Sequence, residues 1–236
     1  MVKEILINCL TPLDNYIFGT ADLTGIIDQK FGEYRFGITI GRRLDDTIID
    51  GINKGPTLEY YNHYNQINFE LASLAGKIKN ELQKVNIDSI IIDPTNANNS
   101  NGLAVYIRTL TVDISHKMVA TRAGLGWIGK TDLFISKEFG PRLRLVSLLI
   151  NRRPEIDLIP ITSSRCGNCC ICVDLCPAKA ANGKLWNVKV YRDEFFDAHK
   201  CRDKCGELTK QKLKVDKRLC GLCVSICPIG KRKEGN

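Results

Sequence analysis

The sequence has 236 residues, of which 44% are hydrophobic and 25% are charged. This composition is typical of a globular protein with a hydrophobic core, and the length predicts one or two domains. No run approaches the roughly 18 consecutive apolar residues of a membrane span, and the apolar N-terminal stretch is too short for a secretory signal. These features disfavour membrane-spanning, secreted, collagenous and disordered proteins, so we expect a cytoplasmic protein that does not bind membranes.

The positive charge is concentrated in the last third of the chain. Residues 1–150 contain 16 Lys and Arg against 16 Asp and Glu, whereas residues 151–236 contain 18 against 10 and carry the whole net charge of +8. This excess fits a solvated basic face, or a docking surface for an acidic electron donor or a nucleic acid. It also fits charge compensation, because an iron–sulfur cluster with four thiolates carries about −2.

Hydrophobic periodicity and turn residues predict alternating strands and helices over residues 1–150. The expected elements are a strand at 34–40, a turn region at 45–55, a long helix at 58–85, a short strand at 89–93, an Asn-rich loop at 95–102, a helix at 114–123, a glycine-rich turn at 124–129, and strands at 133–136 and 143–150. Such alternation indicates an α/β or α+β layered domain. Prolines and charges at residues 151–160 mark a boundary, so we predict domains at 1–155 and 156–236.

Cysteine spacing is the strongest chemical signal. Ten of the 11 cysteines lie between Cys166 and Cys227, which does not suit an extracellular disulfide framework spread over the chain. They form the runs Cys166-x2-Cys169-x2-Cys172-x3-Cys176-Pro177 and Cys220-x2-Cys223-x3-Cys227-Pro228. The first run is that of bacterial ferredoxins, in which the fourth cysteine ligates the other cluster.

Exchange of the fourth ligands between the two runs predicts two [4Fe–4S] clusters. The predicted ligands are Cys166, Cys169, Cys172 and Cys227 for the first cluster, and Cys176, Cys220, Cys223 and one of Cys201 or Cys205 for the second. Spacing alone does not decide between Cys201 and Cys205, although we favour Cys201. Four cysteines also bind zinc, but two interlocked runs with Cys-Pro ends favour iron–sulfur clusters.

The segment from Gly124 to Thr131 (GLGWIGKT) matches two phosphate-binding patterns. Phosphate loops follow a strand and open a helix, whereas here a helical segment precedes the loop and a strand-like segment follows it. We therefore favour a tight turn near a different cofactor over a nucleotide site that would use Lys130 and Thr131.

Asp113 precedes a predicted helix, where an aspartate commonly caps the helix and where a catalytic carboxylate is the alternative. The three histidines, His63, His116 and His199, show no metal-ligand spacing with one another.

Three segments together resemble one family: residues 112–130 (VDISHKMVATRAGLGWIGK), residues 139–150 (FGPRLRLVSLLI) and the paired cysteine runs. The chain resembles the epoxyqueuosine reductases, iron–sulfur proteins similar to the reductive dehalogenases. The resemblance implies a nitroreductase-like N-terminal domain and a C-terminal ferredoxin-like domain with two [4Fe–4S] clusters. It also implies a cobalamin and reduction of an epoxide on a modified tRNA base.

The resemblance also implies roles for individual residues. Asp113 matches the family's proposed proton donor, and Cys201 matches its lone cysteine between the two runs. The family's glycine-rich loop implies cofactor contacts at Gly124, Gly126, Trp127, Gly129 and Lys130. We expect this chain to be a short member without the family's C-terminal helical-repeat domain. It also has Lys130-Thr131 where the family usually has Lys-Asn.

The sequence therefore predicts an enzyme, an iron–sulfur reductase that passes electrons through two [4Fe–4S] clusters to a cobalamin. The alternative is a ferredoxin-like electron-transfer or redox-activating protein without its own corrinoid. Expected partners are an acidic electron donor such as a ferredoxin or flavodoxin, and a tRNA or small-molecule substrate. The sequence leaves the substrate and the oligomeric state open.

Overall fold

The computed structural model describes residues 1–95 and 102–231, so the Asn-rich loop predicted at 95–102 lies almost entirely outside the described residues. The described chain divides into two units, each assembled from separate stretches of sequence. The first contains Met1–Arg43, Ile67–Leu125 and Arg144–Ile161. The second contains Leu44–Gln66, Gly126–Leu143 and the chain from Thr162 onward. The domain boundary predicted between residues 155 and 156 stays a prediction.

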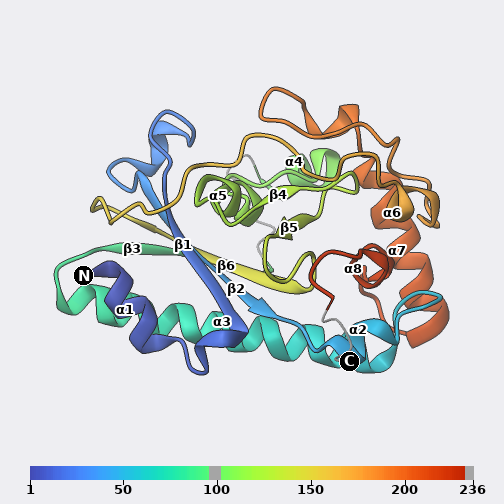
Figure 1. Cartoon of the computed structure of the whole chain (residues 1–236), viewed down its shortest axis with the longest axis horizontal. Helices are drawn as coiled ribbons and strands as arrows, with labels where there is room; N and C mark the ends of the chain where they lie inside the picture. The colour runs from blue at the N-terminus through green and yellow to red at the C-terminus, as the bar shows by residue number, and fades with distance from the viewer. Residues whose placement is uncertain (96–101, 232–236) are drawn as a thin grey trace. The chain divides into compact units, whose positions relative to one another are not determined.

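A four-stranded sheet forms the centre of the first unit (Figure 1). Its strand order is β1 (Tyr16–Asp22), β2 (Phe36–Arg43), β6 (Leu143–Ile150), β3 (Ser89–Ile92). The pairs β1–β2 and β3–β6 are antiparallel, with Ser89 opposite Ile150. The central strand β6 is a nearly continuous apolar run, LRLVSLLI, and all but one of its residues are buried. A strand covered on both faces needs such a run, whereas a half-exposed strand would alternate.

Helices cover both faces of this sheet. Helix α3 (Leu58–Lys84) lies along one face in Figure 1, on the same side as α1 (Val2–Cys9). Its apolar residues recur at helical spacing, and Ile67, Leu71, Ile78 and Leu82 are at most 1% exposed. Helix α5 (His116–Arg122) packs against β1 and β2 on the other face. It approaches closely where β2 has Gly37, since a Cβ at Gly37 would lie 2.7 Å from the Val119 side chain.

The second unit is built from short elements joined by long loops. They are α2 (Asp46–Asp50), a hairpin of β4 (Gly126–Ile128) and β5 (Phe134–Ser136), α6 (Ile171–Asp174), α7 (Ala198–Leu213) and α8 (Leu222–Ile226). Helix α8 contacts both α2 and α6. Only α7 exceeds five residues among these helices, so side-chain interactions must supply much of this unit's order.

The predicted helix at 58–85 and the strands at 34–40, 89–93, 133–136 and 143–150 are confirmed, with ends shifted by a few residues. The predicted helix at 114–123 is confirmed as α5. Two predictions are wrong in part. The turn region at 45–55 contains α2, because the Asp45 side chain accepts hydrogen bonds from the N–H groups of Thr47 and Ile48. The turn at 124–129 contains β4, whose pairing with β5 is a non-local contact.

The mixed α/β class is confirmed, while the nitroreductase-like and ferredoxin-like assignments of its parts remain predictions. No helix in the described parts of the chain is both long and apolar enough to cross a membrane.

His116, at the start of α5, is held between two neighbours in the first unit. Its Nε2–H donates to the carbonyl oxygen of Asp93 at 2.9 Å. Its Nδ1 then accepts from the Ser147 hydroxyl at 3.0 Å. Burial lowers the pKa of His116 to about 4, and the Asp93 carbonyl opposes this only partly. The ring is therefore neutral at pH 7 in the folded protein.

This histidine makes stability depend on pH. In the unfolded chain His116 becomes protonated below about pH 6.5, whereas in the folded protein it becomes protonated only near pH 4. Between these pH values the unfolded state binds more protons, so lowering the pH favours unfolding. We expect the free energy of unfolding to lose about 3 kcal/mol through this group between pH 7 and pH 4. Urea denaturation of the wild type and of His116→Gln at several pH values measures this loss. The difference between their free energies of unfolding should shrink as the pH falls from 7 to 4. A difference that stays constant down to pH 4 would contradict the assignment.

Candidate metal centre and the adjoining loop

All ten cysteines of the C-terminal part belong to the second unit, and none of them is in a disulfide. The first run leads into α6, which contains Cys172, and Cys176 follows just beyond the end of that helix. Helix α7 contributes Cys201 and Cys205, one turn apart. Helix α8 contains Cys223, and Cys227 is the residue that ends it.

One set of thiols combines both runs, and we name it the first thiol group: Cys166, Cys169, Cys172 and Cys227. The thiol of Cys227 lies within electrostatic range of the other three. Burial raises the pKa of Cys227 to about 11, and these neighbouring sulfurs add to that rise. Burial likewise raises the pKa of Cys172. Cys169 is exposed and the other three are half-buried. Thiols this close to one another need compensating positive charge before they all ionise.

Five of the six remaining thiols form a second set, the second thiol group: Cys176, Cys201, Cys205, Cys220 and Cys223. The sixth, Cys170, belongs to neither group. Burial raises the pKa of Cys223 to about 12, with contributions from Cys176, Cys220 and Cys201. The sulfurs of Cys201 and Cys205 are 3.9 Å apart, and Cys205 also hydrogen-bonds Cys220. This last contact raises the pKa of Cys205 and lowers that of Cys220 to about 7.

The structure thus places Cys227 with the first run and Cys176 with the second. Both Cys201 and Cys205 belong to the second thiol group. The donor set is all sulfur, which suits an iron–sulfur cluster or zinc. Among the described residues, no three His, Cys, Asp or Glu side chains are arranged to hold a metal ion as the side chains stand.

The part of the GLGWIGKT segment from Gly126 onward belongs to the second unit and contacts these thiols. The indole Nε1–H of Trp127 donates to the Cys166 sulfur at 3.5 Å. The Lys130 ammonium is 4% exposed and donates to the Cys170 sulfur at 3.2 Å. Thr131 partly offsets the rise that burial causes in the pKa of Cys172 and of Cys223. The sequence did not predict a contact between this loop and the cysteines, because nothing in local spacing links residues 40 positions apart.

The glycines of this segment are required by close contacts within the protein. A Cβ at Gly126 would overlap the backbone carbonyl of Ile135, its neighbour across the β4–β5 hairpin. Gly124 has a φ of +69°, and a Cβ there would lie 2.6 Å from the Ile159 carbonyl oxygen. These groups, like those of Trp127 and Lys130, are engaged with the protein itself. The corrinoid contacts predicted for this loop stay a prediction.

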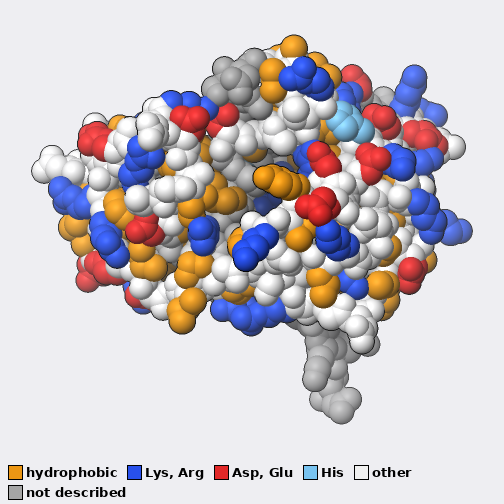
Figure 2. Space-filling model, turned by 90° about the horizontal axis from the view of Figure 1, so that it is seen from above, with side chains coloured by type: hydrophobic (Ala, Val, Ile, Leu, Met, Phe, Trp, Pro, Cys, Tyr) orange, Lys and Arg blue, Asp and Glu red, His pale blue; other side chains and the backbone are white. Residues whose placement is uncertain are grey.

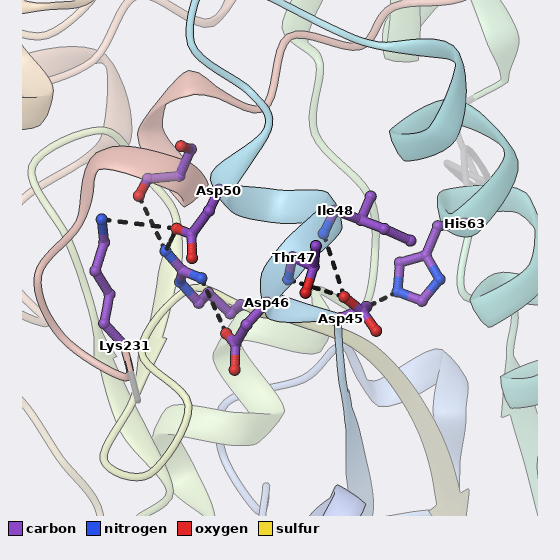
Figure 3. A network of polar contacts seen from close by, with 9 residues as sticks. Asp45, Asp46, Thr47, Ile48, Asp50, His63 and Lys231 are labelled. Atoms are coloured by element: carbon purple, nitrogen blue, oxygen red, sulfur yellow. Dashed lines mark hydrogen bonds and ion pairs between the residues drawn. The ribbon is translucent and has the colours of Figure 1, made fainter. Parts of the chain in front are cut away.

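A buried arginine fixes the segment that carries the second cysteine run. Arg142 is fully buried, and its guanidinium donates to Asp46 at 2.9 Å, to Asp50 at 2.5 Å and to the carbonyl of Ser225 at 3.2 Å. Figure 3 shows Asp46 and Asp50 on α2 pointing toward this guanidinium, with Lys231 3.7 Å from Asp50 on the other side. The guanidinium lowers the pKa of Asp50. Since Ser225 lies between Cys223 and Cys227, Arg142 ties α2 to that run.

The same helix is capped by Asp45, whose backbone N–H donates to Nε2 of His63 at 3.0 Å (Figure 3). His63 therefore has a structural contact in this unit.

Asp113 lies in the first unit, between α4 (Leu103–Thr109) and α5. Its carboxylate forms an ion pair with Lys30 at 3.1 Å, and its side chain is 22% exposed. An open pocket of about 690 Å³ lies in this unit, lined by Thr24, Gly25, Ile27, Asp28, Gln29 and Arg35. Lys30 comes directly after Asp28 and Gln29 in the sequence. No sequence pattern pointed to the contact between Lys30 and Asp113. Asp113 therefore has a charged partner next in sequence to the pocket lining, although neither Asp113 nor Lys30 lines the pocket itself.

The basic residues do not gather into one patch on the face seen in Figure 2. Lys and Arg side chains are spread over that face, with Asp and Glu between them. This mixed surface does not decide whether the net positive charge serves to dock a partner or to compensate the negative charge of iron–sulfur clusters.

Solved structures define the class of fold. The chain matches a catabolic reductive dehalogenase in complex with 3-bromo-4-hydroxybenzoic acid, with a TM-score of 0.63 and 13% identity over 92% of this chain and 30% of that one. It matches an epoxyqueuosine reductase, solved with an epoxyqueuosine-modified tRNA stem loop, with a TM-score of 0.60 and 17% identity over 100% of this chain and 66% of that one. The chain shares the mixed α/β fold of these two groups of redox proteins.

Sequence relatives narrow the comparison to one group. The chain is 36% identical over 120 residues to an epoxyqueuosine reductase of Lactococcus garvieae, covering 48% of this chain and 31% of the relative. It is 30% identical over 149 residues to that of Atelocyanobacterium thalassa, covering 58% and 45%. The predicted resemblance to epoxyqueuosine reductases is confirmed, over less than half of these relatives' own length. No protein-family model matches the chain.

Proposed function

We propose that the chain is an iron–sulfur oxidoreductase with two [4Fe–4S] clusters, one in each thiol group. The observation that carries this proposal is the interleaving of the two runs, with Cys227 beside Cys166, Cys169 and Cys172. Such interleaving is what two clusters with exchanged fourth ligands require. Cys176, Cys220, Cys223 and Cys201 are the proposed ligands of the second cluster, with Cys205 the neighbouring thiol.

Burial supports this assignment on electrostatic grounds. The pKa of Cys223 near 12 and that of Cys227 near 11 mean that these thiols stay protonated at neutral pH without a cation. Iron supplies the positive charge that lets them ionise, as metal binding does at thiolate sites generally. The buried ammonium of Lys130 adds a fixed positive charge beside the first run.

The proposed activity is reductive chemistry of the kind named for the relatives, the reduction of epoxyqueuosine. A cobalamin, when bound, would supply the reactive metal for such a reduction, while the clusters deliver single electrons. Within the chain, Asp113 is the proposed general acid, and Lys30 orients its carboxylate. The proposed partners are an acidic electron donor, such as a ferredoxin or flavodoxin, and a tRNA or small-molecule substrate.

Asp113→Asn tests the proton-donor role. The amide keeps the size of the side chain but removes its acidic proton, so we expect turnover of an epoxyqueuosine-containing tRNA stem loop to fall about 100-fold or more. The iron content should not change. Asp157→Asn is the matched control, because Asp157 pairs with Lys3 at an exposed site of the same unit. Unchanged turnover in Asp113→Asn would remove this residue from the mechanism.

A second candidate function is electron transfer to a partner protein without a bound corrinoid. It is favoured by the engagement of Trp127 and Lys130 with cysteine sulfurs, which leaves the corrinoid without evident contacts in this loop. Electron transfer of this kind would depend on docking of a partner and weaken with salt.

A cobalamin titration of the anaerobically prepared, cluster-loaded protein separates the two functions. The reductase predicts saturable binding and a visible spectrum shifted to the base-off form of the corrinoid. Absence of binding with both clusters intact would contradict the cobalamin-dependent reductase and leave the electron-transfer protein.

A further inference from the structure

Two basic side chains are buried among the residues that the structure describes, Arg142 and Lys130. Arg142 has two carboxylate partners, Asp46 at 2.9 Å and Asp50 at 2.5 Å. Lys130 is 4% exposed, and in the described chain its ammonium hydrogen-bonds one group, the sulfur of Cys170, at 3.2 Å. A buried ammonium needs a negative charge close by, because its transfer out of water is costly. Lys130 thus lacks the carboxylate counter-ions that Arg142 has.

The Lys130 ammonium lies at the cysteines of the first run. Cys170, its partner, directly follows Cys169, a proposed ligand of the first cluster, and consecutive Cα atoms are only about 3.8 Å apart. From the same hairpin, the Nε1–H of Trp127 donates to the sulfur of Cys166, another proposed ligand, at 3.5 Å. The ammonium and the indole N–H therefore approach the same run, where a cluster would place negative charge.

The lysines next to the second thiol group are placed differently. Lys200 and Lys204 flank its α7 cysteines in the sequence, but their side chains are 64% and 30% exposed. Each is already paired with a carboxylate, Lys200 with Asp197 at 3.5 Å and Lys204 with Glu207 at 2.6 Å. Water and salt screen such exposed pairs, so they act weakly on a buried group.

We propose that Lys130 is the buried counter-ion of the first cluster and selectively raises the reduction potential of that cluster. This inference rests on the proposed function, because it requires a [4Fe–4S] cluster in the first thiol group. A cluster with its four thiolates carries about −2, and one-electron reduction takes it to about −3 without forming or breaking a covalent bond. A fixed positive charge stabilises the more negative, reduced form, and burial strengthens this effect because little water screens it.

The test is an anaerobic redox titration of the cluster-loaded protein with dithionite, followed by electron paramagnetic resonance. The signal that is lost in Cys227→Ala identifies the first cluster. Lys130→Met removes the charge and keeps most of the length of the side chain. We expect the reduction equilibrium of the first cluster to shift about tenfold or more toward the oxidised form, a fall of about 59 mV or more for a one-electron couple. The potential of the second cluster should change much less.

Three variants are the controls. Lys130→Arg keeps the positive charge, so the first potential should fall less than half as far as in Lys130→Met. Lys200→Met removes an exposed, paired ammonium beside the second thiol group and should leave both potentials near those of the wild type. Cys170→Ala should also leave the first potential near that of the wild type, because the charge that Lys130 compensates is that of the cluster.

The loss of the charge can also prevent loading of the first cluster, and Lys130→Gln is the second charge-free variant for that case. If the Met and Gln variants load only the second cluster while Lys130→Arg loads both, the role of the positive charge is supported. Loss of the first cluster in all three variants would show that the site needs the lysine side chain itself, and would overturn the counter-ion role.

The remaining outcomes separate the inference from the function on which it rests. Two intact clusters with an unchanged first potential in Lys130→Met would overturn the inference, and so would an equal fall of both potentials. A rise of the first potential in Cys170→Ala would also overturn it, since a thiolate at Cys170 would then be the counter-ion of Lys130. A wild-type protein that loads fewer than two clusters would overturn the proposed function itself, and this inference with it.

Discussion

Cys227→Ala is expected to leave the reduced protein with the signal of only one [4Fe–4S] cluster. Cys227 belongs to the second run by sequence, but its thiol lies with Cys166, Cys169 and Cys172. Its loss should therefore affect the cluster of the first run, and iron should fall from about eight per chain toward about four. Electron paramagnetic resonance and iron analysis of anaerobically reconstituted protein measure the result.

Three further cysteine variants are the controls for this experiment. Cys170→Ala should keep both clusters, because Cys170 is bonded to Lys130 and belongs to neither thiol group. Cys201→Ala should disturb the second cluster, and Cys205→Ala should leave it in place. The reverse outcome for Cys201 and Cys205 would reassign the eighth ligand, since their sulfurs are only 3.9 Å apart. Loss of the second cluster in Cys227→Ala with the first intact would contradict the exchange of ligands.

Arg142→Met is expected to lower the free energy of unfolding by about 1.5–3 kcal/mol, because its hydrogen bonds are lost while the Asp46 and Asp50 carboxylates keep access to water. The guanidinium is fully buried, and its loss would leave Asp46, Asp50 and the Ser225 carbonyl without their common donor. Because Ser225 lies between Cys223 and Cys227, we also expect slower cluster loading. Chemical denaturation of the anaerobic, loaded protein measures the stability loss.

The controls for Arg142 separate its geometry from its charge. Arg142→Lys keeps the charge but cannot reach both carboxylates in the same way, so we expect an intermediate loss of stability. Arg153→Met changes an exposed guanidinium and should alter the free energy of unfolding by less than about 0.5 kcal/mol. A loss in Arg142→Met no larger than that in Arg153→Met would contradict the role given to Arg142.

The strong periodic signals in the sequence predicted their elements correctly. Helix α3 repeats apolar residues over 27 positions, and β6 is a buried apolar run, so local pattern and tertiary position agree. Helix α2 has only five residues and depends on the cap at Asp45. Because aspartate is also common in turns, the sequence pattern predicted a turn at this place. Strand β4 was missed because three residues with a glycine become a strand only through pairing with β5.

The candidate site divides in the same way. Spacing within each cysteine run predicted which thiols could share a cluster, since a tight loop and a short helix fix their local geometry. Spacing could not predict the contacts from Trp127 and Lys130, because these come from a hairpin far away in the chain. For the same reason the pairing of Lys30 with Asp113 had no local signal.

Determination of iron and sulfide, with Mössbauer spectroscopy, on anaerobically reconstituted wild-type protein tests the central claim most directly. Two clusters held by the two thiol groups predict about eight irons and about eight sulfides per chain, all in [4Fe–4S] form. About four irons per chain, or zinc bound tightly in place of iron, would contradict it.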